Sequence, residues 1–191
     1  MKKSDTSKIE FEKAEKPEAR RFVKKFDTSM IVYIGVLTAM EIVLNRFLSI
    51  NAWNLKIGFS FVPVAIAGML FGLHPAAIVA ALGDFVGALV FPIGPYFPGF
   101  TFTAFLTGAV FGFFLKGKTS VPRVLAAVGI NQLILSLLLN SLWISVLYGS
   151  PYLPLLSTRI VQCAVLIPVE IILILAFGRA FGSLGDKVSA L

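Results

Sequence analysis

Hydrophobic residues fill six long segments of the chain, and short breaks rich in proline, glycine or charge separate them. The segments span residues 30–50, 58–72, 75–92, 100–115, 121–148 and 155–181. A helix that crosses a bilayer needs roughly 20 mainly apolar residues, and proline, glycine and charge are the residues expected where such helices end. The pattern therefore predicts an all-α integral membrane protein with six transmembrane helices.

The composition agrees with a membrane location. Hydrophobic residues make up 57% of the 191 residues and charged residues only 14%, whereas soluble domains carry about 25% charged residues. So few charges could not cover the surface of a soluble domain of this size. A large soluble catalytic domain is therefore excluded.

The charges that remain predict the domain organisation and the direction of the helices. Residues 1–28 hold nine of the 17 basic and six of the ten acidic residues, which predicts a charged cytoplasmic N-terminal tail before a membrane domain at 29–182 and a cytoplasmic C-terminal tail at 183–191. Basic residues gather on cytoplasmic loops. With six crossings, both termini are cytoplasmic, and only three basic residues are left outside: Arg46, Lys56 and Arg159. Merging residues 58–92 into one crossing would break this pattern, so a very short inner turn is expected around 72–75.

Three acidic residues fall inside apolar segments, where an ionisable group is expensive and is a functional candidate by default. These are Glu41, Asp84 and Glu170. Asp84 is the strongest candidate, because a row of alanines and glycines surrounds it at helical spacing; a purely structural pairing with a neighbouring helix is the alternative. Glu170 follows Pro168 by two residues and is expected to pack inside the bundle, without a ligand role.

The connection at 91–100 points to a binding site. It contains three prolines, two glycines and no charge, so it is neither a regular helix nor a simple solvated loop. Irregular backbone at membrane depth is tolerated where it lines a cavity, and the neighbouring segments are short enough to leave a recess on the outer face. A rigid interfacial turn is the alternative. An arginine facing this recess would imply an anionic ligand, although Arg159 could also simply reach towards the membrane surface.

Small residues recur at a spacing of four on two of the predicted helices. They are Gly35 and Ala39 on the first, and Ala76 and Ala80 on the third. Such rows let helices approach closely, within the chain or against a partner. The chain carries no phosphate-binding Gly-x-x-x-x-Gly-Lys-Ser/Thr loop, and its single cysteine and single histidine leave no imidazole or thiolate metal site.

The run from Gly83 to Thr101, preceded by the stretches 45–50 and 57–59, resembles the folate-specific substrate-binding (S) component of energy-coupling factor (ECF) transporters. The similarity covers about residues 30–182. It implies an S-component fold in a bacterial cell membrane and a non-enzymatic subunit that captures folate outside. It also implies delivery of folate inward with a transmembrane coupling subunit and two ATPase subunits, with no cofactor and no nucleic acid.

The resemblance and the residues together give a candidate site. Folate joins a flat pterin through an aminobenzoyl ring to a glutamate. Asp84 is expected to accept hydrogen bonds from the pterin edge, and Arg46 or Arg159 to meet the glutamate. Aromatic and polar side chains are expected to complete the slot: Tyr96, Phe97, Phe100, Thr101, Asn140, Trp143 and Gln162.

The resemblance also implies a contact with the coupling subunit. Many family members carry Ala-x-x-x-Ala on the first helix, where this chain has Gly35 and Ala39. We expect these two residues, with Ala76 and Ala80, to form the partner interface.

The same residues leave other functions open. An S component for riboflavin or thiamine, or a proton-coupled carrier using Asp84 and Glu170, would fit the same segments. An integral-membrane lipid enzyme would need clustered carboxylates or a nucleophile beside a base, and the sequence shows only isolated acids.

Overall fold

The computed structural model describes residues 28–52, 55–117 and 119–188. The chain divides into two compact units, 1–33 and 34–191. Of the first unit, the described residues 28–33 form the beginning of helix α2. The description below concerns the second unit, so the predicted tail at 1–28 lies almost wholly outside the described residues.

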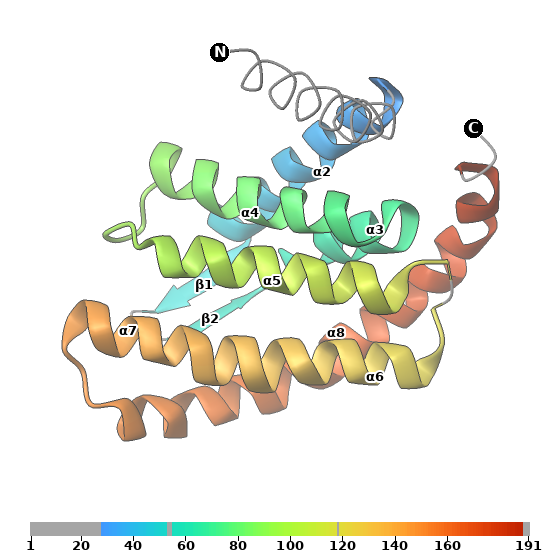
Figure 1. The fold of residues 1–191 in the computed structure, drawn as a ribbon. Helices are drawn as coiled ribbons and strands as arrows, with labels where there is room; N and C mark the ends of the chain where they lie inside the picture. Colours follow the sequence, from blue (N-terminus) through green and yellow to red (C-terminus); the bar gives the residue numbers. More distant parts are fainter. Residues whose placement is uncertain (1–27, 53–54, 118, 189–191) are drawn as a thin grey trace, which may run out of the picture. The chain divides into compact units, whose positions relative to one another are not determined.

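Helices account for nearly all of the described chain, and the predicted six helical segments are confirmed (Figure 1). Five of them are long and apolar enough to cross a membrane. The helices are α2 (Thr28–Arg46), α3 (Phe61–Phe71), α4 (Leu73–Val90), α5 (Pro98–Leu115), α6 (Val121–Gly129) continued by η1 (Ile130–Leu139) and α7 (Asn140–Tyr148), and α8 (Tyr152–Val188).

The sequence prediction missed an antiparallel pair of short strands. Strand β1 (Ser49–Ala52) pairs with β2 (Leu55–Gly58), so that Ile50 lies opposite Ile57 and Asn51 opposite Lys56. Polar and apolar residues alternate along both strands, as a period of two requires. The long apolar segments on either side hid this alternation. As a result, the first helix ends at Arg46 rather than at residue 50, and the next begins at Phe61.

The predicted short turn after the second segment is confirmed. Helix α3 ends at Phe71 and α4 begins at Leu73, with Gly72 alone between them at φ 87°. This left-handed conformation favours glycine. Helix α3 has 11 residues, which span about 16 Å, only about half of the hydrocarbon core.

Helices α4 and α5 form the most extensively packed pair (Figure 1). Two glycines of α5 allow this approach: Gly108 lies against the backbone of Ala76, and Gly112 against the backbone of Gly72 and Leu73. Ala76 and Ala80 are 0% and 4% exposed. The structure therefore places these two alanines inside the bundle, which corrects their expected place at a partner interface.

One long rod, formed by α6, η1 and α7, packs against α8. Helices α6 and α7 continue each other through η1, a ten-residue stretch of π-helix (Figure 1). Helix α8 contains Pro168, and its backbone remains helical to Val188, within the segment expected to be a C-terminal tail.

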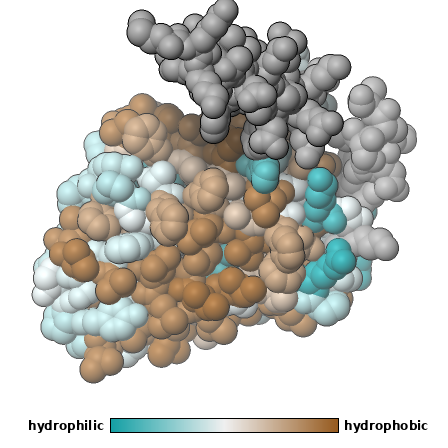
Figure 2. All heavy atoms as spheres, in the orientation of Figure 1, coloured by the Kyte–Doolittle hydropathy of each residue, from teal (hydrophilic) through white to brown (hydrophobic). Residues whose placement is uncertain are grey.

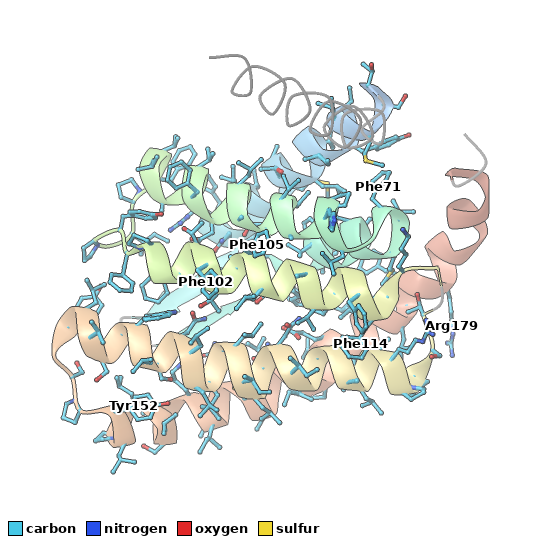
Figure 3. The ribbon with its side chains drawn as sticks, viewed as in Figure 1. Phe71, Phe102, Phe105, Phe114, Tyr152 and Arg179 are labelled. Atoms are coloured by element: carbon cyan, nitrogen blue, oxygen red, sulfur yellow. The ribbon has the colours of Figure 1, made fainter. Side chains whose placement is uncertain are left out.

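The outer surface of the bundle is apolar. Figure 2 shows hydrophobic residues across the middle of the visible face and the most hydrophilic described residues near the end where α5 joins α6. Phe102 and Phe105, labelled on α5 in Figure 3, are 55% and 42% exposed. Arg179 lies near the same α5–α6 connection (Figure 3), where Gly178 packs against Thr119. With Lys116 and Arg123, this end carries the basic residues that predict a cytoplasmic side.

Candidate functional site

A cavity of about 380 Å³ lies among α2, α3, α4, α5, η1, α7 and α8, with the end of β2 also at its wall. Pockets for small molecules commonly have volumes of about 300–1,000 Å³. The connection between α4 and α5 lines the cavity from Ile93 to Phe97, and Tyr148 at the end of α7 lines it too. A Cβ atom at Gly94 would lie 3.1 Å from the Tyr148 hydroxyl oxygen, so these two parts of the rim lie close together. The rim formed by the α4–α5 connection and the end of α7 lies at the end of the bundle opposite the α5–α6 connection and its basic residues (Figure 1).

Aromatic side chains gather at this rim. The ring of Phe97 lies 5.5 Å from that of Trp143 and 6.1 Å from that of Phe100, and Tyr96 lies 5.8 Å from Phe85. The absence of a side chain at Gly99 makes the cluster possible, since a Cβ there would come within 2.7 Å of the indole of Trp143. Flat rings bind well between such side chains.

A chain of hydrogen bonds fixes the aromatic rim to α5. The indole N–H of Trp143 donates to the Thr103 hydroxyl at 3.0 Å, and this hydroxyl donates to the carbonyl of Gly99 at 2.9 Å. Trp143 does not line the cavity itself, whereas Phe97 and Phe100 do. We infer that Trp143 supports Phe97 from behind.

Asp84 is held at the rim by two of the other predicted residues. Thr101 donates to its carboxylate at 2.8 Å, and the hydroxyl of Thr101 lies 3.2 Å from that of Tyr96. Arg46 donates to the backbone carbonyl of Asp84 at 3.4 Å. Asp84 and Arg46 both line the cavity, and Thr101 acts through Asp84.

The glycines beside Asp84 make room for polar side chains of α2. The carboxylate of Glu41 lies against Gly83, and the guanidinium of Arg46 lies against Gly87, where a Cβ would come within 2.9 Å of Nε. Asn45 donates to Glu41 at 2.6 Å. The small-residue row of α4 thus packs against the polar face of α2. The sequence alone could not show whether this row contacts a helix of the same chain or a helix of a partner.

Arg159 of α8 is the most deeply buried cation of the described chain. It is 5% exposed and lines the cavity. Its Nε and Nη1 atoms have no hydrogen-bond partner among the described residues. The alternative in which Arg159 reaches towards the membrane surface does not fit this burial. A buried guanidinium with unpaired donors is suited to a carboxylate ligand.

The sequence prediction missed the polar residues at the opposite end of the cavity. Gln132 donates to the Glu170 carboxylate at 2.5 Å, and Asn131 donates to the carbonyl of Thr107 at 3.5 Å. Glu170 does pack inside the bundle as expected, but it also lines the cavity, as do Gln132 and Asn131. The spacing of 159, 162, 166 and 170 on one helical face was the available signal.

The predicted site residues thus meet in one place. Eight of them line the cavity: Arg46, Asp84, Tyr96, Phe97, Phe100, Asn140, Arg159 and Gln162. Gly35 and Ala39 instead lie exposed on α2, and Ala39 borders a shallow apolar groove with Val36 and Met40. Within residues 28–52, 55–117 and 119–188, no three His, Cys, Asp or Glu side chains are grouped to hold a metal ion.

Comparisons with known proteins agree with one another. The family described as "ECF transporter, substrate-specific component" matches residues 29–177. The chain is 43% identical to "Folate transporter FolT" of Clostridium novyi over 147 residues, which cover 76% of this chain and 86% of that protein. It is 30% identical to "Folate transporter FolT" of Leuconostoc mesenteroides, over 77% of this chain and 83% of that protein.

A solved structure described as "Crystal structure of FolT bound with folic acid" matches with a TM-score of 0.72 and 36% identity. The match covers 76% of this chain and 88% of the solved one.

Proposed function

This chain belongs to the substrate-specific (S) components of ECF transporters, which are multi-pass proteins of bacterial membranes, and we propose that it is the folate-binding subunit of such a transporter. The observation that carries the proposal is the 43% identity to a folate transporter across most of both chains. The 36% identity to a protein solved with folic acid supports the same ligand.

The chemistry of the cavity suits this ligand. Folate carries two carboxylates, and the unpaired donors of Arg159 and the guanidinium of Arg46, which lines the same cavity, would bind them. Phe97, Phe100 and Tyr96 would contact the flat rings at the rim. Asp84, already oriented by Thr101, would accept N–H groups of the ligand with the rest of its carboxylate. Asn140 and Gln162 would complete the polar wall.

Uptake requires other subunits in this proposal. The sequence holds no phosphate-binding loop for ATP, so two ATPase subunits and a transmembrane coupling subunit would supply the energy and the inward step. Gly35 and Ala39 lie on the exposed side of α2, where a neighbouring helix could approach closely. They are the proposed contact with the coupling subunit.

Ligand binding to the purified chain tests the proposal. In detergent, calorimetry or quenching of tryptophan fluorescence should give submicromolar binding of folate and a clear preference over riboflavin and thiamine. Trp143 would report on binding because its ring lies against that of Phe97. Folate binding weaker than micromolar, or equal binding of the three vitamins, would refute the assignment.

A further inference from the structure

Three basic side chains gather at the end of the membrane domain where α5 joins α6. They are Lys116 directly after α5, Arg123 in the first turn of α6 and Arg179 on α8, and all three are exposed. Thr119 of the connection lies against Gly178, which brings the neighbouring Arg179 to the same place (Figure 3). We call Lys116, Arg123 and Arg179 the basic group.

The position of Lys116 is fixed by a glycine of another connection. A Cβ atom at Gly72, in the turn between α3 and α4, would lie 2.6 Å from Cδ of Lys116 and 3.2 Å from its Nζ. The missing side chain at Gly72 therefore leaves room for the lysine to lie across the turn. As a result, the ammonium group lies where α3, α4 and α5 meet.

Little negative charge lies near the basic group. The segments 116–123 and 179–187 together hold five basic residues and one acidic residue, Asp186. Asp186 is seven residues beyond Arg179, which is about 10 Å along a helix axis. The acidic residues whose side chains the structure describes line the cavity instead: Glu41, Asp84 and Glu170. This end of the domain therefore keeps a net positive charge that an external anion can neutralise.

Apolar side chains that face outwards lie on the same helix faces as two of the cations. Phe113 precedes Lys116 by three residues and is 69% exposed, and Ile172 precedes Arg179 by seven residues and is 66% exposed. Residues at these spacings share one face of a helix. Each cation thus lies at the end of an apolar surface, as a phospholipid requires: a charged site for its phosphate and an apolar surface for its acyl chains.

We propose that the basic group binds the headgroup phosphate of an anionic phospholipid in the cytoplasmic leaflet. Basic pockets between transmembrane helices on the cytoplasmic side bind such headgroups, and a guanidinium can bind two phosphate oxygens at once. None of the three residues lines the cavity. The lipid site is therefore separate from the proposed folate site, and it does not depend on the identity of the transported ligand.

Two other roles for these cations are weaker explanations. Orientation of the chain in the membrane needs positive charge on the cytoplasmic side, but it needs neither the seat of Lys116 over Gly72 nor the apolar surfaces beside the cations. An acidic surface of another protein could also neutralise the charge. However, Phe113 and Ile172 place two of the cations at the border of the hydrocarbon, where lipid headgroups lie.

Native mass spectrometry of the full chain tests the proposal. The chain is titrated in mixed micelles with phosphatidylglycerol or with phosphatidylcholine of the same acyl chains. The wild type should bind one phosphatidylglycerol at least about tenfold more tightly than phosphatidylcholine, because three cations contribute. Lys116→Gln, Arg123→Gln and Arg179→Gln should each weaken phosphatidylglycerol binding about fivefold and leave phosphatidylcholine binding unchanged, which also shows that the variants are folded.

Lys56→Gln is the matched control, because it removes the same charge from strand β2. It should bind phosphatidylglycerol as the wild type does. Equal binding of the two lipids by the wild type, or an equal loss in Lys56→Gln and Arg179→Gln, would overturn the proposal. Displacement of the lipid by glycerol 3-phosphate at constant ionic strength would overturn it too, because the site would then select a free phosphate.

Discussion

The guanidinium of Arg159 is unusual among the charged groups of this membrane domain. A buried charge normally has a partner, because moving an ion out of water costs several kcal/mol even after relaxation. Arg159 is 5% exposed, and two of its nitrogen atoms have no partner in the described part of the chain. A group kept in this state at the wall of a cavity is suited to a ligand that brings the opposite charge.

Replacing this side chain should therefore affect the carboxylate end of the ligand selectively. Arg159→Ala should weaken folate binding by at least about 30-fold, because losing one partner of a buried charge pair costs about 2–5 kcal/mol. Pteroate, which lacks the glutamate, should lose less affinity. Arg46→Ala should show the same preference with a smaller loss, since Arg46 is only half-buried. Calorimetry with both ligands measures the difference, and equal losses would remove the arginines from glutamate binding.

Individual site residues were predictable to the extent that their chemistry is rare in this sequence. Asp84, Arg46 and Arg159 stand out because so few charges lie outside the N-terminal tail. Gln132 and Asn131 did not stand out, because the direction of an amide side chain depends on how the helices pack. For Glu170, only the tertiary structure shows that its second oxygen is free.

Helix boundaries were predictable where a proline, glycine or charge ends an apolar run. The expected segment 121–148 coincides with the rod of α6, η1 and α7, and 100–115 differs from α5 by two residues at its start. The strands β1 and β2 were not predicted, since their alternating residues sit between two apolar segments. The π-helical geometry of η1 also has no signal in the sequence, because its ten residues are as apolar as their neighbours.

At the scale of helices, glycines decide which pairs pack closely. Gly112 lies against the backbone of Gly72 and Leu73, and a Cβ there would come within 2.6 Å of the carbonyl carbon of Gly72. Backbone cannot move aside as a flexible side chain can. The close contact between the α3–α4 turn and α5 is therefore possible only because residue 112 has no side chain.

Gly112→Ala should destabilise the membrane domain by about 1–3 kcal/mol, the usual range for overpacking. Thermal unfolding in detergent, followed by circular dichroism, would show it as a lower midpoint temperature. Gly129→Ala is the matched control, because it lies in the helical rod and a Cβ there meets nothing within 4 Å. A midpoint for Gly112→Ala equal to that of Gly129→Ala would mean that α5 moves away without loss.

Over the whole membrane domain, the polar residues are divided between an interior cavity and one basic end. Lys116, Arg123 and Arg179 lie at the end remote from the α4–α5 connection, whereas Glu41, Arg46, Asp84, Arg159 and Glu170 line the cavity. The outer surface between them is apolar (Figure 2). In the proposed transport, the coupling subunit would make its contact on that apolar surface.

The two rows of small residues differ in how well they suit this contact. Ala76 and Ala80 are already buried against the rest of the bundle, whereas Gly35 lies exposed and a Cβ there meets nothing within 4 Å. Gly35→Leu or Ala39→Leu should therefore leave folate affinity of the isolated chain unchanged, because neither residue lines the cavity. A leucine would still hold a neighbouring helix away from α2.

Assembly with the proposed coupling and ATPase subunits should be lost in these variants, and with it folate uptake into cells or vesicles. Co-purification of the subunits and uptake of labelled folate measure the two effects separately. Ile172→Leu, on an exposed face of α8, controls for a general effect of surface leucines. Normal uptake by Gly35→Leu and Ala39→Leu would place the coupling contact elsewhere on the apolar surface. Packing within the described chain does not explain this row, because a Cβ at Gly35 meets nothing within 4 Å.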